Sequence, residues 1–267
     1  MLTLNKTLLY RHHQEGHPPH SHPHLPPSAG METHQSGGRE IKVVRRVLDA
    51  NDIMAAKNRE LFASKGIFVL NMMSSPGSGK TTILQKTLAQ LMPELRCAVI
   101  VGDICTTQDA DRLALSGAPV VQINTDQFGG DCHLAAHVIE RALGGLDLDV
   151  VDLLIVENIG NLVCPAEFDI GEDKRVVVLS VTEGEDKPAK YPLMFRQCDA
   201  MLLNKIDLLP YLEYDPAITL NSVAQIHPGM PVFRLSAKTG QGFEAWVQWL
   251  KDQIAAKRRD GERGRSK

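Results

Sequence analysis

The stretch GIFVLNMMSSPGSGKTTIL, residues 66–84, decides the fold of this chain. It joins an apolar, strand-like run to a short loop of Ser, Pro and Gly, and a segment with helical spacing begins at Lys80. In this order the loop N–H groups and the helix N-terminus face a phosphate, which the Lys80 ammonium also reaches. Thr81 adds a hydroxyl that can ligate Mg²⁺, whereas Ser74 replaces the glycine usual at the first loop position. We therefore predict a phosphate-binding loop.

The chain of 267 residues has 43% hydrophobic and 23% charged residues, which suits one folded domain with tails. Its net charge of −3 gives no reason to expect nucleic-acid binding, and no apolar run has the length of a membrane span. The N-terminus lacks a signal-peptide pattern, and five scattered cysteines do not suit a disulfide framework, so a cytoplasmic location is expected. Cys97 and Cys198 start apolar strands and are predicted to be core residues, while the role of Cys105 stays open.

Residues 1–39 are rich in His, Pro, Gly and Ser and nearly devoid of core-forming residues. Such a segment cannot bury enough apolar surface to offset its ordering entropy, so we predict a disordered tail. Neutral imidazoles bind Ni²⁺ and Cu²⁺ well, which favours metal binding over a low-complexity linker or a purification tag. The predicted nickel ligands of the tail are His12, His13, His17, His20, His22 and His24, and His34 lies in the same segment.

Residues 40–257 are predicted to form one α/β domain, and residues 258–267 a basic, polar tail. An amphipathic helix is expected over residues 42–65, and alternating strands and helices follow. Nearly continuous apolar strands predict a mostly parallel, twisted sheet with helices on both faces, the architecture of P-loop NTPases. The expected strands are 67–73, 97–102, 119–123, 150–156, 176–182, 200–204 and 232–235. The expected helices are 80–91, 107–116, 131–143, 189–197, 216–227 and 242–256.

Two short motifs indicate which base the bound nucleotide carries. NKID, residues 204–207, follows a predicted strand, and SAK, residues 236–238, follows the next one. The Asp207 carboxylate can accept hydrogen bonds from N1–H and the N2 amino group of guanine, whereas adenine offers neither in that geometry. Lys205 can lie over the ring, Asn204 can tie loops together, and the second motif can meet the base through its backbone. The chain is therefore predicted to bind GTP and GDP.

The predicted hydrolysis machinery departs from that of common GTPases. Glu157 and Gly160 form Glu-x-x-Gly where Asp-x-x-Gly is usual, and that glycine can present its N–H to the γ-phosphate. Asp103 can hold Mg²⁺ through water or orient the attacking water, or else serve as a helix N-cap or loop carboxylate. No glutamine is obviously placed to orient water, so slow turnover is expected. Lys187 and Lys190 either contact nucleotide, in one chain or across a dimer, or lie in a solvated loop.

The residues predicted for the nucleotide site have three roles: catalysis, Mg²⁺ binding and GTP binding. The catalytic residues are Lys80, Asp103 and Glu157, and Mg²⁺ is assigned to Thr81 and Asp103. The GTP-binding residues are Gly77, Ser78, Gly79, Lys80, Thr81, Thr82, Gly160, Asn204, Lys205, Asp207, Ser236, Ala237 and Lys238.

A further group of residues combines thiol and imidazole side chains. Cys132 and His133 are adjacent, His137 shares a helix face with His133, and Cys164 precedes Pro165 after the next predicted strand. Both cysteine-bearing loops are expected at the sheet edge that carries the phosphate loop. Cys132, His133 and Cys164 supply three ligands of a four-coordinate metal site, which a second copy of the chain could complete. The alternative is two buried, inert cysteines and a surface histidine.

Several motifs together resemble the HypB family of hydrogenase nickel-incorporation GTPases: SSPGSGKTT, GDICTTQDADRL, DCHLAAHVIERAL, ENIGNLVCPAEFDIGE, EGEDKPAKYP and NKIDLLPYL. The resemblance covers about residues 40–250 and implies a nickel metallochaperone of [NiFe] hydrogenase maturation, with a nucleotide-promoted homodimer. It implies that Cys132, His133 and Cys164 bind Ni²⁺ or Zn²⁺, and that the partners are the nickel chaperone HypA and a hydrogenase large-subunit precursor. The N-terminal Cys-x-x-Cys-Gly-Cys motif of some relatives is missing here, because no cysteine precedes Cys97.

Three other functions stay open on the sequence alone. A urease-type nickel accessory GTPase would share the architecture, but UreG-like proteins centre their metal site on Cys-Pro-His, and here Cys164-Pro165 is followed by Ala166. A nickel-storage protein would need no turnover, because its nucleotide would only set the oligomeric state. A signalling GTPase would carry the histidine-rich tail incidentally. A nickel metallochaperone, in contrast, is expected to change its metal affinity with the bound nucleotide.

Overall fold

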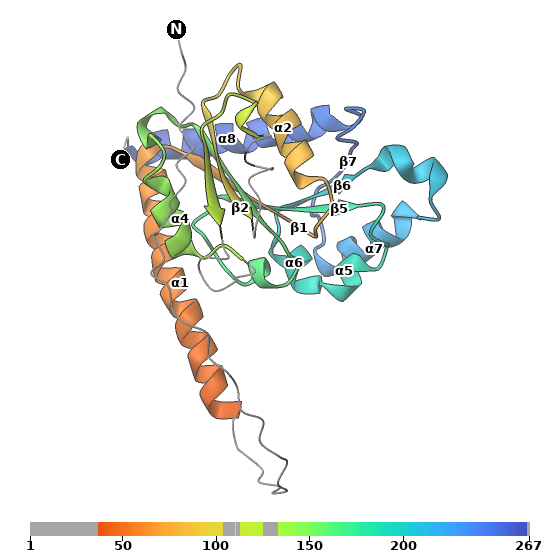
Figure 1. The fold of residues 1–267 in the computed structure, drawn as a ribbon, viewed down its shortest axis with the longest axis horizontal. Coiled ribbons are helices and arrows are strands. Elements are labelled where there is room, and N and C mark those ends of the chain that lie inside the picture. Colours follow the sequence, from red (N-terminus) through yellow and green to blue (C-terminus); the bar gives the residue numbers. More distant parts are fainter. Residues whose placement is uncertain (1–36, 104–109, 111–112, 125–132, 266–267) are drawn as a thin grey trace, which may run out of the picture.

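The computed structural model describes residues 37–103, 110, 113–124 and 133–265 (Figure 1). They form a seven-stranded sheet in the order β3-β2-β4-β1-β5-β6-β7, in which neighbouring strands run parallel. The strands are β1 (Phe68–Ser74), β2 (Cys97–Asp103), β3 (Val120–Asn124), β4 (Leu153–Gly160), β5 (Lys174–Ser180), β6 (Ala200–Asn204) and β7 (Val232–Arg234). The predicted parallel sheet of a P-loop NTPase is confirmed.

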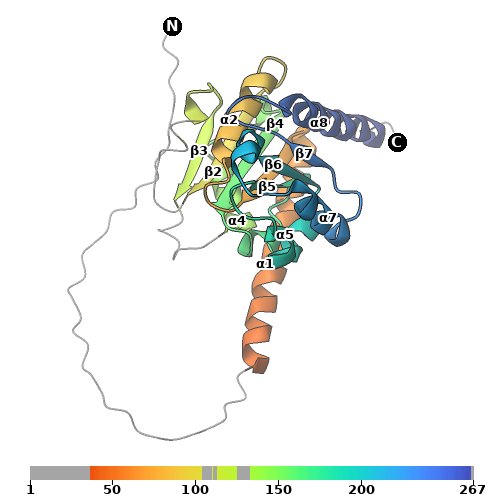
Figure 2. The same cartoon turned by 90° about the vertical axis from the view of Figure 1, so that its right-hand side faces the viewer.

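Helices cover both faces of the sheet (Figures 1 and 2). One face carries α1 (Gly37–Lys65) and α4 (Ala136–Leu143), and the other carries α2 (Lys80–Leu91) and α8 (Phe243–Arg265). Beside β5 and β6 lie α5 (Lys187–Lys190), α6 (Pro192–Gln197) and α7 (Pro216–Ile226). Short 3₁₀ helices occupy loops: η2 (Leu148–Val150), η3 (Cys164–Ala166) and η4 (Ile206–Tyr211).

The central strand β1 shows why both faces need a cover. Phe68, Leu70 and Met72 are buried among side chains of α2 and α8, whereas Ile67 and Val69 are buried on the side of α1 and α4. Successive side chains of a strand point to opposite faces, so a strand with a core on both sides must be apolar throughout. This explains why a run that is apolar except for Asn71 precedes the phosphate loop.

The start of α4 differs from the prediction. The expected helix covered residues 131–143, but residues 131 and 132 lie outside the described part, and the helix begins at Ala136. Before it, the Leu134 N–H donates to Asn158 Oδ1 (3.2 Å), and the Ala136 N–H donates to Asn51 Oδ1 (2.9 Å). Side chains from distant segments thus satisfy N–H groups at this helix start, as local caps do elsewhere.

Two other boundaries have local causes. The predicted helix 189–197 is two helices, because the backbone leaves the helical region at Tyr191 (φ −125°, ψ 53°) and Pro192 cannot continue a hydrogen-bonded helix. Strand β4 starts later than the predicted residue 150, because the Asp147 carboxylate accepts the Asp149 N–H and caps η2. The predicted helix 107–116 lies largely outside the described residues.

Both terminal helices extend beyond their predicted ends. Helix α1 begins at Gly37, and α8 continues to Arg265, so residues 258–265 of the predicted basic, polar tail are helical. Lys257 Nζ donates to the Ile67 carbonyl and to Asp173 Oδ2, both at 2.6 Å, which anchors α8 to the residues directly before β1 and β5. The predicted histidine ligands of the N-terminal tail lie outside the described residues.

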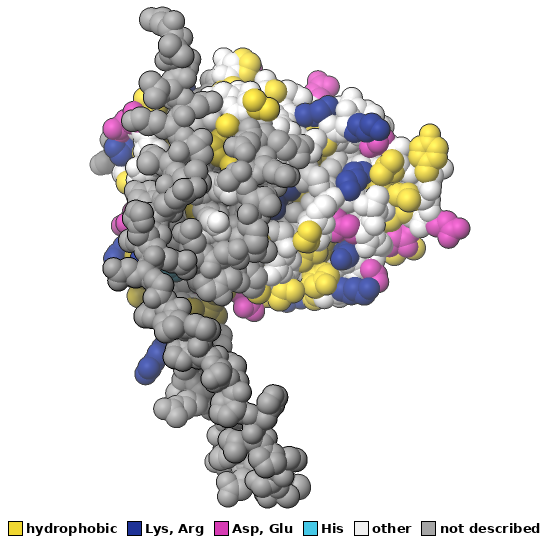
Figure 3. Space-filling view, viewed as in Figure 1, with side chains coloured by type: hydrophobic (Ala, Val, Ile, Leu, Met, Phe, Trp, Pro, Cys, Tyr) yellow, Lys and Arg dark blue, Asp and Glu magenta, His cyan; other side chains and the backbone are white. Residues whose placement is uncertain are grey.

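The described surface carries charges of both signs. On the face drawn in Figure 3, Lys and Arg side chains alternate with Asp and Glu, and hydrophobic side chains lie between them. Within the residues that the structure describes, no helix is both long and apolar enough to cross a bilayer.

Candidate nucleotide site and metal-bearing loops

The loop between β1 and α2 borders a cavity of about 390 Å³. Gly77 and Gly79 adopt left-handed backbone conformations, with φ of 76° and 93°, which other residues rarely take. A Cβ at position 79 would also lie 2.5 Å from Asn204 Nδ2, so only glycine fits there. The lining residues are Ser74, Ser75, Pro76, Gly77, Ser78, Gly79, Lys80, Thr81, Thr82, Gly102, Glu157, Ile159 and Gly160. The cavity therefore lies at the N-terminus of α2, which favours an anion.

Two buried side chains at the start of α2 bond to β4. Lys80 Nζ donates to the Asn158 carbonyl (2.5 Å), and Thr81 Oγ1 donates to Glu157 Oε1 (2.7 Å). Lys80 is 8% exposed and Glu157 is 3% exposed, so both groups act in a region of low dielectric. Charged groups held in place in such a region interact strongly with a phosphate or a cation.

Gly160 and Asp103 are the last residues of the neighbouring strands β4 and β2, at the carboxyl edge of the sheet. Gly160 pairs with Ser74, and a Cβ on it would lie 3.2 Å from Pro76 Cγ, so the missing side chain lets the phosphate loop approach β4. Asp103 ends β2 and pairs with Asn124 of β3. Its side chain is outside the described part, so the assignment of Asp103 to Mg²⁺ or water stays a prediction.

Asn204, at the end of β6, ties the phosphate loop to the second predicted guanine loop. Its Nδ2 donates to the Ser78 carbonyl (2.8 Å), and its Oδ1 accepts the Ala237 N–H (3.0 Å). Lys205 follows in a left-handed conformation (φ 61°) and donates from Nζ to the Gly77 carbonyl (2.7 Å). The predicted tie between loops is confirmed, and it fixes the phosphate loop relative to the loop of residues 236–238.

The Asp207 carboxylate is held by the second motif. Ser236 Oγ donates to Asp207 Oδ1 (2.6 Å), and the Thr239 N–H donates to the same Ser236 hydroxyl (3.1 Å). The Lys238 carbonyl accepts a hydrogen bond from Lys86 Nζ of α2 (3.3 Å). The structure thus brings the two predicted guanine motifs into direct contact, with Asp207 Oδ1 fixed by a hydroxyl donor.

Glu183 contacts the phosphate loop, and the sequence analysis missed this contact. It accepts hydrogen bonds from the Ser75 hydroxyl of the phosphate loop and from the Ser180 N–H (3.0 Å). Burial raises the pKa of Glu183, while the Ser180 N–H and the charges of Lys187 and Lys205 oppose that rise. Its position just after a predicted strand was the available signal, because strand ends at this edge carry the site.

The two lysines of the EGEDKPAKYP segment differ in their surroundings. Lys190, the last residue of α5, forms an exposed ion pair with Asp186 (2.5 Å). Lys187 lies over the ring of Tyr191, 5.6 Å from its centroid, and its charge acts on Glu183. Lys187 is therefore electrostatically connected to the phosphate-loop region, while Lys190 is occupied at the surface.

The two segments that carry predicted metal ligands meet at an aromatic contact. The His133 ring stacks on Phe168, with centroids 3.7 Å apart, and Phe168 follows Cys164 of η3 in the same loop. Cys164 and His133 are both partly buried, while Cys132 lies outside the described residues. Among the described residues, no group of three or more His, Cys, Asp and Glu side chains is arranged to hold a metal. The three-ligand set stays a prediction.

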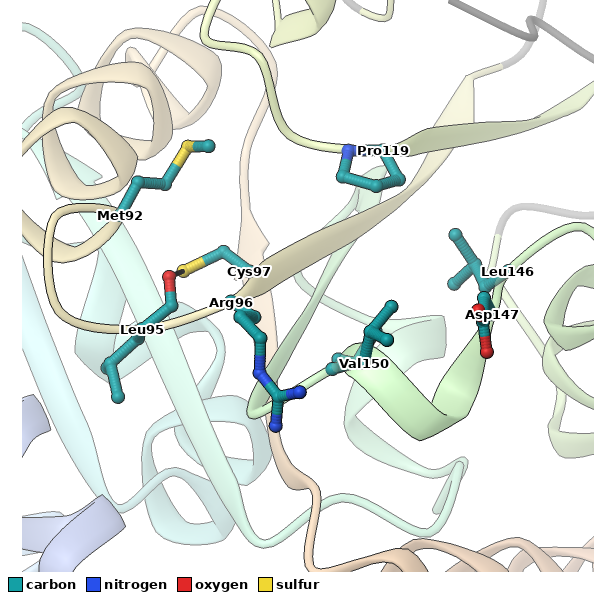
Figure 4. A pocket seen from close by; sticks show the side chains of 9 residues that line it. Met92, Leu95, Arg96, Cys97, Pro119, Leu146, Asp147 and Val150 are labelled. Atoms are coloured by element: carbon teal, nitrogen blue, oxygen red, sulfur yellow. Dashed lines mark hydrogen bonds between the residues drawn. The ribbon is translucent and has the colours of Figure 1, made fainter.

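Cys97 and Cys198 are core residues, as predicted. Both thiols are buried, and burial raises the pKa of Cys97 to about 12 and also raises that of Cys198. Cys97 starts β2 and borders a mostly apolar hollow of about 250 Å³ at the amino edge of the sheet, where its Sγ points at the Leu95 carbonyl (Figure 4). This hollow lies at the opposite strand ends from the phosphate loop, so Cys97 is remote from that loop.

The parallel sheet, the phosphate loop and the paired guanine motifs define a P-loop GTPase. A family model described as "CobW/HypB/UreG, nucleotide-binding domain" matches residues 68–234. The hydrogenase maturation factor HypB of Escherichia coli (strain K12) is 48% identical over 218 residues, which cover 82% of this chain and 74% of that protein. The chain therefore belongs to the CobW/HypB/UreG family and, within it, to the HypB hydrogenase maturation factors.

Solved structures extend this similarity to three dimensions. HypB from Helicobacter pylori in complex with nickel superposes with a TM-score of 0.72 at 38% identity, over 78% of this chain and 96% of that one. HypB from Archaeoglobus fulgidus has a TM-score of 0.72 at 35% identity, over 77% and 99%. The resemblance read from the sequence motifs is thus confirmed in fold and family.

Proposed function

We propose that the chain is a GTP-hydrolysing nickel metallochaperone that supports nickel insertion into a [NiFe] hydrogenase precursor. The contact between His133 and Phe168 carries the proposal, because it joins the segment after β3 to the segment of Cys164. Both segments follow strands at the carboxyl edge of the sheet, where the loop of Lys80 also lies. The nickel complex of the H. pylori relative supports nickel as the ion.

Cys132, His133 and Cys164 hold the cargo Ni²⁺ in this proposal, and Zn²⁺ competes for the same ligands. Thiolate and imidazole are donors that both ions accept. The partial burial of His133 and Cys164 leaves these side chains accessible to an incoming ion. Three ligands leave a tetrahedral site incomplete, and a second copy of the chain, joined in a nucleotide-promoted homodimer, completes it.

The residues around the cavity suit GTP with Mg²⁺. The Thr81 hydroxyl and the Glu157 carboxylate lie together, and oxygen donors of this kind are those that Mg²⁺ prefers. Among the described residues, none forms a hydrogen bond with the buried Ser78 hydroxyl, which is available to a phosphate oxygen. Bound Mg²⁺ would neutralise charge on the β- and γ-phosphates. Lys80 would then give up or share its bond to Asn158 to reach the γ-phosphate, and Asp207 would accept from guanine.

The proposed partners follow from the cargo. HypA delivers nickel to the chain, and the hydrogenase large-subunit precursor receives it after GTP hydrolysis. Turnover is slow in this proposal, because no glutamine is obviously placed to orient the attacking water. A storage protein would bind nickel equally well but would need no hydrolysis.

The test is nickel transfer between purified proteins. The full chain, loaded with radioactive Ni²⁺, is mixed with the large-subunit precursor in GDP, in GTP and in a non-hydrolysable GTP analogue. Transfer should be fastest with GTP and should lose its GTP dependence in Lys80→Ala. Equal transfer in all three nucleotides would contradict the proposal, and phosphate release by the wild type would exclude pure storage.

A further inference from the structure

Asn158 is a buried amide that connects the two faces of β4. It is 1% exposed and follows Glu157, whose carboxylate contacts Thr81 on the α2 side of the sheet. Successive strand residues point to opposite faces, so the Asn158 side chain lies on the side of α1 and α4. There its Oδ1 accepts the N–H of Leu134, the residue after His133.

One peptide group of β4, between Asn158 and Ile159, forms hydrogen bonds with both the Lys80 ammonium and the Asn158 side chain. Its carbonyl, that of Asn158, accepts from Lys80 Nζ (2.5 Å), and its N–H, that of Ile159, donates to Asn158 Oδ1 (2.9 Å). The same Oδ1 accepts the Leu134 N–H at 3.2 Å. Because a peptide group is planar, a tilt caused at the carbonyl also moves the N–H and the oxygen bonded to it.

The hydrogen-bond chain also reaches the loop that follows Cys164. Asn158 Nδ2 donates to Asn71 Oδ1 (3.2 Å), and Asn71 Nδ2 donates to Glu172 Oε1 (3.2 Å). Glu172 Oε2 accepts the Ile170 N–H (2.8 Å), two residues beyond Phe168. Buried polar groups lose their hydration and must be paired, so a shift of one member is passed to its partners.

We propose that Asn158 is the positioning residue through which the nucleotide state reaches the metal-bearing loop. When a γ-phosphate draws Lys80 away from the Asn158 carbonyl, the peptide group tilts and changes the bond to the Leu134 N–H, beside His133. This inference rests on the proposed function, because it assigns the residue that links GTP to nickel affinity.

Asn51 provides a matched control. It is a buried amide on α1, its Oδ1 accepts the Ala136 N–H (2.9 Å), and its Nδ2 donates to the Asp169 carbonyl (2.7 Å). It therefore holds the same two loops as Asn158, but its bonds do not include the carbonyl that receives Lys80. Removal of the Asn51 amide should loosen the loops equally in every nucleotide state.

The experiment measures Ni²⁺ affinity of the full chain by competition with a chelator, in GDP and in a non-hydrolysable GTP analogue. The wild type should show a ratio of affinities between the two states of about 5- to 150-fold. In Asn158→Ala this ratio should fall to about one, while GTP still binds, because the main-chain carbonyl and Lys80 are retained. Asn51→Ala should change both affinities by the same factor and keep the ratio.

A conservative variant and a measurement on the wild type complete the test. Asn158→Asp keeps an oxygen that accepts the Leu134 and Ile159 N–H groups and should retain the ratio. Hydrogen exchange of the Leu134 amide in the wild type should differ between the two nucleotide states, whether or not Asn158→Ala folds. An unchanged ratio in Asn158→Ala, or identical Leu134 exchange, would overturn the role of Asn158 alone. A wild-type ratio of one would overturn the proposed function as well.

Discussion

At the phosphate loop the functional side chains bond to one another and to strand ends, whereas at the two loops of the predicted metal ligands buried side chains bond to the backbone. Lys80 and Asn204 are buried and fixed by hydrogen bonds within one chain. His133 and Cys164 are partly buried, and buried amides such as Asn51 hold the backbone near them. The nucleotide side is therefore preorganised, while the predicted metal ligands His133 and Cys164 remain accessible.

The largest effect should come from a substitution at the nucleotide site, measured as a loss of GTP turnover. Lys80→Ala removes the buried ammonium at the phosphate cavity and should lower kcat/KM for GTP by about 1000-fold, as the loss of a fixed transition-state donor does. Steady-state phosphate release measures it. Lys251→Ala, which only breaks an exposed ion pair with Glu94, should leave turnover unchanged. A kcat/KM of Lys80→Ala within about tenfold of the wild-type value would show that this lysine does not hold the phosphates.

Substitution of the predicted metal ligands should weaken Ni²⁺ binding and leave GTP binding unchanged. Cys164→Ala or His133→Ala should weaken Ni²⁺ binding by at least about 100-fold, because even partners that only orient a ligand cost roughly 10- to 100-fold. GTP affinity should not change. The assay is chelator competition on the full chain and on a chain without residues 1–36, since the histidine-rich tail adds its own sites. His137→Ala, at an exposed position of α4, is the control and should bind nickel normally.

A change of base specificity tests the predicted contact between Asp207 and guanine. Asp207→Asn removes a charged acceptor for guanine and should cost about 1.5–3 kcal/mol of GTP binding, or roughly 10- to 150-fold. Xanthine carries a carbonyl where guanine carries its amino group, so the new amide should favour XTP. Affinities for GTP and XTP, measured by calorimetry, test this. If Asp207→Asn kept the wild-type preference, the base would lie elsewhere.

The smallest effect, on the free energy of unfolding, is expected for the pair of Arg96 and Asp152 at the amino edge of the sheet. Arg96 hydrogen-bonds Asp152 and lowers its pKa to about 2, with a further contribution from Arg258 and against a rise due to burial. A lowered carboxyl pKa stabilises the fold above the usual aspartate pKa, and this stability is lost as the pH falls through about 2. Solvent screens the pair, so Asp152→Asn should cost only about 1 kcal/mol at pH 7.

Urea unfolding at several pH values checks that last expectation. The difference in the free energy of unfolding between wild type and Asp152→Asn should shrink as the pH is lowered and vanish near the lowered pKa. GTP turnover and nickel affinity should match the wild type at neutral pH. A change in either would mean that the amino edge of the sheet acts on the sites at the carboxyl edge.

The strands and the phosphate loop were predictable because their signals are local. An apolar run followed by Gly77 and Gly79 specifies a strand and a loop that only glycine can form, and the NKID and SAK motifs each lie within a few residues. Pro192 also breaks the helix by a local rule that the sequence carried. Where neighbours along the chain determine the structure, the sequence was sufficient.

The start of α4 and the role of Glu183 depend on contacts that no local pattern shows. Asn51 and Asn158 reach the α4 region from other parts of the chain, and the Glu183 carboxylate meets Ser75 across the sheet edge. A polar residue within an apolar helix or strand is a weak signal of such contacts, because it must find a partner when buried. The sequence shows that Asn158 is polar, but only the fold shows which groups it joins.

The most direct measurement of the link between the two regions is a nickel titration of the wild-type chain in GDP and in a non-hydrolysable GTP analogue. One sheet edge carries the buried Lys80 contact and the backbone that holds His133. The two affinities should therefore differ by about 5- to 150-fold. Equal affinities in the two nucleotides would contradict the link and leave a GTPase whose nucleotide site does not act on its metal.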